Sequence, residues 1–157
     1  MQDIQNNIHQ LLGDKIIDIK MLQESQGEND WLDYVLTFIE LHKNGIINFP
    51  FAGALDFGNV ILDTKAEPIS SKAHPIVVGQ TIKELYYESD EEDQPRNDWF
   101  AFIELSNGYV IHENRMAPHG TGAANLFMYD SQQFLEMKKS EEYNLIPLTI
   151  FIKQSQK

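Results

Sequence analysis

The sequence predicts an α+β fold whose mostly antiparallel sheet is built from two tandem repeats, each containing a β-hairpin. An N-terminal helix, and a C-terminal helix followed by a strand, complete the predicted fold. Three observations predict it: landmark motifs that occur twice, Asn-Gly pairs between apolar runs, and helical periodicity near both ends. Because 157 residues suit one ordinary domain, we expect a single domain over residues 1–157.

The first observation is that two segments carry the same landmarks in the same order, 63 to 68 positions apart. The first segment contains Asn29-Asp30-Trp31 and Phe38-Ile39-Glu40-Leu41, and the second contains Asn97-Asp98-Trp99 and Phe102-Ile103-Glu104-Leu105. Chance similarity between two hairpins is the alternative explanation. We interpret the match as an internal duplication of residues 13–63 and 79–130, with a linker over residues 64–78. Neither half has enough strands to cover its own apolar faces, so a shared core is expected.

The Asn-Gly pairs predict one hairpin in each half. Asn44-Gly45 separates the predicted strands 34–41 and 46–49, and Asn107-Gly108 precedes a return strand over residues 109–111. Asn-Gly readily adopts the positive φ angles that a type I′ turn requires at both central positions. One further strand is predicted in each half, over residues 16–22 and 82–87.

Apolar periodicity predicts the helices. After Asp3, a possible N-cap, apolar residues recur with a period of about 3.6 up to Gly13, as expected for an N-terminal helix. Asp130-Ser131 can cap a second helix over residues 132–143. The β-branched run that follows predicts a final strand over residues 145–152.

The charge and the cysteine count exclude several classes of function. The chain has 24 acidic and 12 basic residues, a net charge of −12, and no cysteine. It therefore cannot form disulfides, use a thiolate nucleophile or bind zinc through cysteine. The negative charge argues against binding to nucleic acid or to an anionic membrane, and favours a basic partner or a cation. The N-terminal residues do not resemble a signal peptide, and no apolar run is close to the roughly 20 residues that a membrane-spanning helix needs. We therefore expect a cytoplasmic, bacterial protein.

An acidic stretch over residues 88–98 is the main candidate site, and its counterpart in the first half is much less charged. Its carboxylates, our candidate partner-binding residues, are Glu88, Asp90, Glu91, Glu92, Asp93 and Asp98. Such a run can steer association with a basic protein. A solvated hairpin loop is the plain alternative. A cation site is the remaining alternative, although the spacing lacks the Asp-x-Asp-x-Asp-Gly pattern, and the distal glutamate, of a calcium loop.

Aromatic residues flank this acidic stretch. Trp99 follows it and Tyr87 precedes it, and both are added to the candidate partner-binding surface because tryptophan and tyrosine are enriched at binding hot spots. Tyr86 and Tyr109 could lie on the same surface. Because Trp31 occupies the matching place in the first half, a structural role for both tryptophans is the alternative.

A second candidate site lies in the second half alone. His112, Glu113 and His119 lie within eight positions, followed by Gly120 and Thr121. A histidine with a carboxylate can act as a general acid or base, or two histidines and a glutamate can bind a metal. No spacing matches a known catalytic or metal motif, so we assign no catalytic residue, metal or cofactor, and a surface loop is the plain alternative.

The overall profile of a short, acidic, cysteine-free, hairpin-rich α+β chain resembles bacterial immunity proteins against contact-delivered or polymorphic toxins. The resemblance covers the whole chain through its profile and carries over no individual residue. It implies a non-enzymatic protein that binds and inhibits a cognate toxin acting in the cytoplasm. Two alternatives remain: a small enzyme or ligand-binding domain that uses residues 112–121, and a structural homodimer. The protein is expected to be a monomer or a homodimer.

Overall fold

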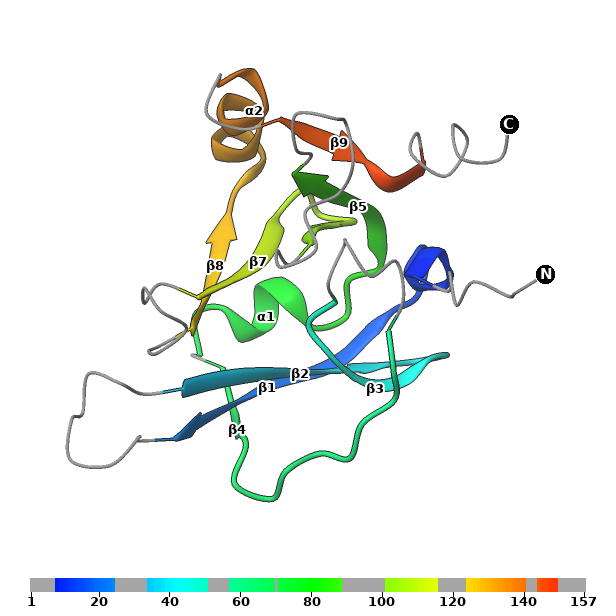
Figure 1. The fold of residues 1–157 in the computed structure, drawn as a ribbon, viewed down its shortest axis with the longest axis vertical. Coiled ribbons are helices and arrows are strands. Elements are labelled where there is room, and N and C mark those ends of the chain that lie inside the picture. The colour runs from blue at the N-terminus through cyan, green and yellow to red at the C-terminus, as the bar shows by residue number, and fades with distance from the viewer. Residues whose placement is uncertain are drawn as a thin grey trace.

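The computed structural model describes residues 8–24, 34–50, 57–69, 71–88, 101–115, 124–140 and 144–149. Their strands form two sheets, in which each strand pair is antiparallel (Figure 1). Sheet 1 has the order β3-β2-β1-β4, and its strands are β1 (Ile16–Glu24), β2 (Tyr34–Leu41), β3 (Gly45–Asn48) and β4 (Glu67–Pro68). Sheet 2 has the order β8-β7-β6-β5-β9, and its strands are β5 (Ile82–Glu88), β6 (Phe102–Leu105), β7 (Val110–Arg115), β8 (Ala124–Tyr129) and β9 (Leu145–Pro147). The predicted α+β class with mostly antiparallel strands is confirmed.

The helices differ in part from the prediction. A 3-10 helix, η1 (Ile8–Leu11), replaces the described part of the expected N-terminal helix, whose beginning lies outside the described residues. Helix α2 (Ser131–Lys139) begins where predicted, because the Asp130 carboxylate accepts from the Gln133 backbone and the Gln133 side chain accepts from the Asp130 backbone. The expected linker contains β4 and a short helix, α1 (His74–Val77). The last strand ends at Pro147, earlier than expected.

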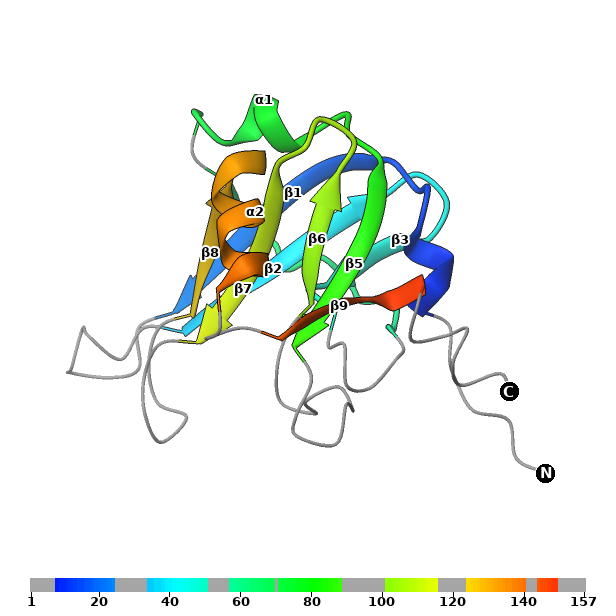
Figure 2. The same ribbon diagram turned by 90° about the horizontal axis from the view of Figure 1, so that it is seen from above.

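The two sheets pack face to face and enclose an isoleucine-rich core (Figure 2). Both sheets contribute fully buried side chains to this core, among them Ile19, Ile39 and Ile47 from sheet 1 and Leu85, Ile103 and Ile111 from sheet 2. Helix α2 covers the outer face of sheet 2, where a second apolar cluster forms around Phe134. Sheet 2 therefore has apolar side chains packed on both of its faces.

Reciprocal backbone hydrogen bonds join the sheets where β1 and β5 begin. Gly13 of the first half bonds to Ile82 of the second half. Equivalently, Gly79 of the second half bonds to Ile16 of the first half. The bonds are Gly13 N to Ile82 O (2.7 Å), Gly79 N to Ile16 O (2.8 Å), Ile82 N to Asp14 O (2.8 Å) and Ile16 N to Gln80 O (2.9 Å). An antiparallel bridge between Lys15 and Thr81 lies at the centre of this arrangement. Each half thus contacts the other through equivalent backbone positions.

Strand register is also equivalent in the two halves. β1 and β5 each have a register shift two residues after they begin, between Ile16 and Asp18 and between Ile82 and Glu84. Four cross-strand pairs of sheet 1 have equivalent pairs in sheet 2. In sheet 1 they are Ile16–Leu41, Asp18–Glu40, Lys20–Phe38 and Phe38–Asn48. Their counterparts in sheet 2 are, in the same order, Ile82–Leu105, Glu84–Glu104, Tyr86–Phe102 and Phe102–His112. Farther along, Lys20 pairs with Pro68 and Tyr86 with Pro147. A position in sheet 1 can therefore be compared directly with its counterpart in sheet 2.

The Asn-Gly pairs do form hairpins, but the expected type I′ turn is wrong. Leu41 pairs with Gly45, so the first loop has three residues instead of two. In the second hairpin Leu105 N donates to Tyr109 O (2.8 Å), which again leaves three loop residues. A glycine with positive φ lies at the end of each turn: Gly45 (+79°) is the first residue of β3 after the first loop, and Gly108 (+92°) is the last residue of the second loop. The second hairpin has the geometry of a three-residue loop closed by a left-handed glycine.

The loop glycines provide a test of this geometry. We expect Gly45→Ala and Gly108→Ala each to lower the free energy of unfolding by about 1–2 kcal/mol, because alanine is strained at positive φ. An added Cβ at Gly45 would also lie 2.6 Å from Asn59 Oδ1, whose side chain must then move. Gly58→Ala is the matched control, since Gly58 lacks positive φ and has open space around it. Urea unfolding of the three variants measures the differences, and equal stabilities would contradict the expected geometry.

Candidate functional site

The acidic stretch connects two neighbouring strands of sheet 2, since the chain leaves β5 at Glu88 and returns in β6 at Phe102. Of the predicted partner-binding carboxylates, only Glu88 belongs to the described residues, where it pairs with Leu145 of β9 and is half-buried. The others, and Trp99, lie outside the described residues: Asp90, Glu91, Glu92, Asp93 and Asp98. The structure therefore locates the point from which this stretch begins, at the end of β5 next to β9.

Tyr87 does not lie on a binding surface, contrary to the sequence prediction. Its side chain is 1% exposed and belongs to the core between the sheets. Tyr86 faces the opposite side of β5 and is covered by α2, with its ring edge-on to Phe134 at a centroid distance of 4.9 Å. Burial, the negative charges of Glu104 and Glu84, and a hydrogen bond to Glu104 raise the pKa of Tyr86 to about 12. Both tyrosines thus have structural roles.

His112 is also a structural residue. Its ring is stacked on Phe102 at a centroid distance of 3.8 Å and is 8% exposed. The Nδ1 atom lies 3.1 Å from the carbonyl oxygen of Ala101, which can only accept, so Nδ1 carries the proton. Burial lowers the pKa of His112 to about 4, although the hydrogen bond to Ala101 acts in the opposite direction. His112 is therefore neutral at physiological pH.

Sheet 1 shows what His112 contributes. Its counterpart by register is Asn48, whose Nδ2 atom donates to the carbonyl oxygen of Thr37 at 3.1 Å. Thr37 occupies the position in β2 that Ala101 occupies just before β6. An amide that cannot titrate makes the same contact in one half that the imidazole makes in the other. The contact therefore requires only a hydrogen-bond donor and no acid-base chemistry.

The proposed pairing of His112 with Glu113 does not occur on one surface. Successive strand residues point to opposite faces, and Glu113 follows Ile111 onto the core face, where it is 1% exposed. His119, Gly120 and Thr121 lie outside the described residues. Among the residues that the structure does describe, no group of three or more histidine, aspartate or glutamate side chains is placed to hold a metal ion.

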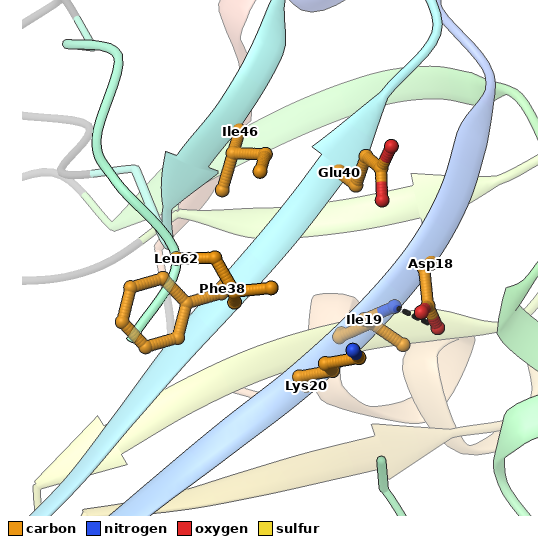
Figure 3. Close-up of a pocket in the computed structure, with 7 residues that line it drawn as sticks. All are labelled: Asp18, Ile19, Lys20, Phe38, Glu40, Ile46 and Leu62. Atoms are coloured by element: carbon orange, nitrogen blue, oxygen red, sulfur yellow. Dashed lines mark hydrogen bonds between the residues drawn. The ribbon is translucent and has the colours of Figure 1, made fainter. Parts of the chain in front are cut away.

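A hollow that sequence reasoning missed lies on the outer face of sheet 1 (Figure 3). It is a shallow depression open to solvent, with a cavity volume of about 10 Å³, which is roughly the space of one water molecule. Its lining residues are Asp18, Ile19, Lys20, Phe38, Glu40, Ile46 and Leu62. This volume is far below the roughly 300–1,000 Å³ of pockets that hold drug-sized ligands, and Phe38 on the floor of the hollow is only 4% exposed.

Charged residues surround the apolar floor of this hollow. Asp18 and Glu40 are cross-strand partners on β1 and β2, and Lys20 follows on the same face. His74 of α1 places its Nε2 atom 3.2 Å from Asp18 Oδ1, and both side chains are partly exposed. Two-residue alternation along the strands places Asp18 and Lys20 on one face. However, Phe38 reads as an ordinary core residue, so the hollow itself left no signal in the sequence.

Within the described ranges, no helix combines the length and apolar character needed to cross a membrane. Comparison of the chain with protein-family models, with curated proteins and with solved structures finds no match.

Proposed function

We propose that this chain is a non-enzymatic binding protein that acts as an immunity protein, inhibiting a cognate, cytoplasm-acting toxin through an acidic surface. The observation that carries the proposal is the concentration of carboxylates over residues 88–98, between two adjacent strands of sheet 2. A toxin that acts on nucleic acid or nucleotides needs a basic cleft, and clustered carboxylates complement such a cleft. The structural role of His112 further supports binding over catalysis.

We also infer that the two halves are copies of one ancestral unit. The matched landmarks in the sequence support this inference, together with the equivalent register shifts, cross-strand pairs and reciprocal hydrogen bonds of the two halves. In this account the acidic stretch is a later specialisation of the second copy, because the first copy carries far fewer carboxylates there. A binding surface added to an existing fold is consistent with a protein that adapts to its partner.

The experiment begins with capture of the partner from the native lysate by the tagged full chain. The matched control is a neutralised-loop variant, with Asp90→Asn, Glu91→Gln, Glu92→Gln and Asp93→Asn. We expect one protein to be captured by the wild type and lost with the variant. Producing that protein in a bacterial host should stop growth, and co-production of the wild-type chain should restore it. An unchanged set of captured proteins, or a captured protein without toxicity, would contradict the proposal.

A further inference from the structure

The edge strands of the two sheets differ in how they are protected. β3 and β4 lie at the edges of sheet 1, and β8 and β9 at the edges of sheet 2. β4 and β9 are very short and each ends in a proline, which cannot donate a hydrogen bond to a further strand. The edge of β3 is covered by its own chain, since Val60 N donates to Ile46 O (2.8 Å) and Ile47 forms a bridge with Asn59. In the part of the chain that the structure describes, β8 has none of these protections.

The composition of β8 suits pairing with a further strand. Its six residues include no proline and no charged side chain. In Figure 1 and Figure 2 it runs along one side of sheet 2, next to β7. An uncharged edge strand of this length is a template for pairing with another chain.

The direction of the β8 backbone groups follows from the hairpin between β6 and β7. Leu105 N donates to Tyr109 O (2.8 Å), so Tyr109 directs its backbone groups toward β6. These directions alternate along an antiparallel strand, so His112, three positions later, directs its groups toward β8. The partner of His112 on β8 is Phe127, whose backbone groups therefore face β7.

The two neighbours of Phe127 face the opposite way. The N–H and C=O groups of Leu126 and Met128 point away from β7, toward the outside of the sheet. Among the described residues, no backbone group outside β8 is hydrogen-bonded to them there. The side chains of both residues pack against the core from a partly exposed position. The edge therefore offers a regular set of donors and acceptors on a well-anchored strand.

Phe127 adds aromatic surface to this edge. Its side chain lies on the outer face of sheet 2 beside His112 and is partly exposed. It belongs to neither of the two apolar clusters that the described residues form. Its ring lies edge-on to that of Tyr129, at a centroid distance of 6.4 Å. An aromatic side chain outside the core, at the edge of a sheet, is typical of a contact surface.

We propose that two copies of this chain form a dimer by antiparallel pairing of their β8 strands, around a two-fold axis at Phe127. In this register Leu126 lies opposite Met128 of the second copy, and their outward backbone groups form hydrogen bonds with one another. Phe127 lies opposite Phe127 of the second copy, where the two rings bury each other. Sheet 2 then continues through both copies.

A second copy suits this edge better than a different protein. An open, uncharged edge is an aggregation hazard, so its occupant has to be present whenever the chain is, and a second copy meets that condition. A two-fold contact uses the same surface on both copies and is therefore closed to a third. Because β8 has no charged residue, the pairing places no like charges opposite one another.

The first experiment measures the molar mass of the full chain by light scattering over a range of concentrations. We expect a monomer–dimer equilibrium with a dissociation constant of roughly 1–100 µM, in keeping with a small interface. Each copy has a net charge of −12, so the dimer should be stronger at about 500 mM salt than at about 50 mM.

Two lysine variants locate the interface. Phe127→Lys places like charges opposite one another and removes the aromatic pair, so it should weaken the dimer at least about tenfold. Ile61→Lys is the matched control, because it makes the same change of charge at a side chain that is 93% exposed and outside sheet 2. It should dimerise like the wild type. Urea unfolding of both variants checks that each is folded.

The absence of cysteine from the chain allows a sharper test of the register. Opposed residues of a pair without mutual hydrogen bonds have Cα atoms about 4.5 Å apart, a separation that suits a disulfide. Phe127→Cys should therefore form a disulfide-linked dimer on mild oxidation in native buffer, and much more slowly in urea. Ile61→Cys, the control, should cross-link slowly in both.

The proposal is overturned if the wild type stays a monomer at every concentration in both salts. It is also overturned if Phe127→Lys, shown to be folded, dimerises like Ile61→Lys, or if Phe127→Cys cross-links no faster than Ile61→Cys. The neutralised-loop variant should dimerise at least as strongly as the wild type, and Phe127→Lys should still capture the toxin. The dimer and the proposed function can therefore fail separately.

Discussion

Replacing Asp14 with alanine is expected to lower the free energy of unfolding by about 3 kcal/mol. The Asp14 carboxylate is 1% exposed and is the anchor of the first hairpin loop. It accepts hydrogen bonds from Lys15 N (2.8 Å), Lys43 N (2.9 Å), Asn44 N (3.0 Å) and Asn44 Nδ2 (2.7 Å). Alanine would leave these donors without their acceptor, and urea unfolding at neutral pH measures the loss.

Gln80→Ala is the matched control, because Gln80 is the counterpart of Asp14 in the second half. Its Oε1 atom accepts one exposed hydrogen bond, from Ser106 Oγ (2.8 Å), so we expect a loss below about 1 kcal/mol. A loss of similar size in both variants would contradict the role assigned to Asp14.

The same aspartate predicts a pH dependence. Burial alone would raise the pKa of Asp14, but the hydrogen bonds from Lys43, Asn44 and Lys15 outweigh it and hold the pKa below its usual range. Its stabilising effect is thus present above the ordinary aspartate pKa and is lost as pH falls through the lower, folded-state pKa. The difference between wild type and Asp14→Ala should therefore shrink in acid.

Replacing His112 with asparagine is expected to protect the protein against acid unfolding. The pKa of His112 is about 4 in the folded protein, against an ordinary value of 6.5. As pH falls from 6.5 to 4, the unfolded chain binds a proton that the folded chain does not, which costs the wild type up to about 3 kcal/mol of stability. Asparagine makes the equivalent contact at position 48 and does not titrate, so the variant should escape this loss.

Urea unfolding at about pH 7.5, 5.5 and 4 tests this expectation. At neutral pH the variant should be somewhat less stable, because the ring stacked on Phe102 is lost. At pH 4 the order should reverse. A stability difference that stays constant between pH 7.5 and 4 would show that His112 is not held neutral by burial.

The position of both hairpins was predictable from sequence, but their turn geometry was not. Asn44-Gly45 marks the reversal because glycine supplies positive φ, and Gly45 does so. The loop has three residues instead of two, and its geometry is held by Asp14, which lies thirty positions before Asn44. A local motif contains no information about such a distant acceptor.

Tyr86 and Tyr87 show why side-chain exposure was harder to predict. A register shift at the start of β5 changes the alternation of its faces, so sequence spacing alone does not say which tyrosine points inward. In addition, α2 returns to cover the outer face, and both tyrosines become buried.

The central claim, that the acidic stretch drives association with a basic partner, is tested most directly by the association rate constant with the purified captured protein. It should be measured for the wild-type chain and the neutralised-loop variant at about 50 mM and 500 mM salt. The account predicts fast association of the wild type at low salt, a fall of roughly tenfold or more at high salt, and slow, salt-insensitive association of the variant. Equal rate constants for the two chains at low salt would contradict it.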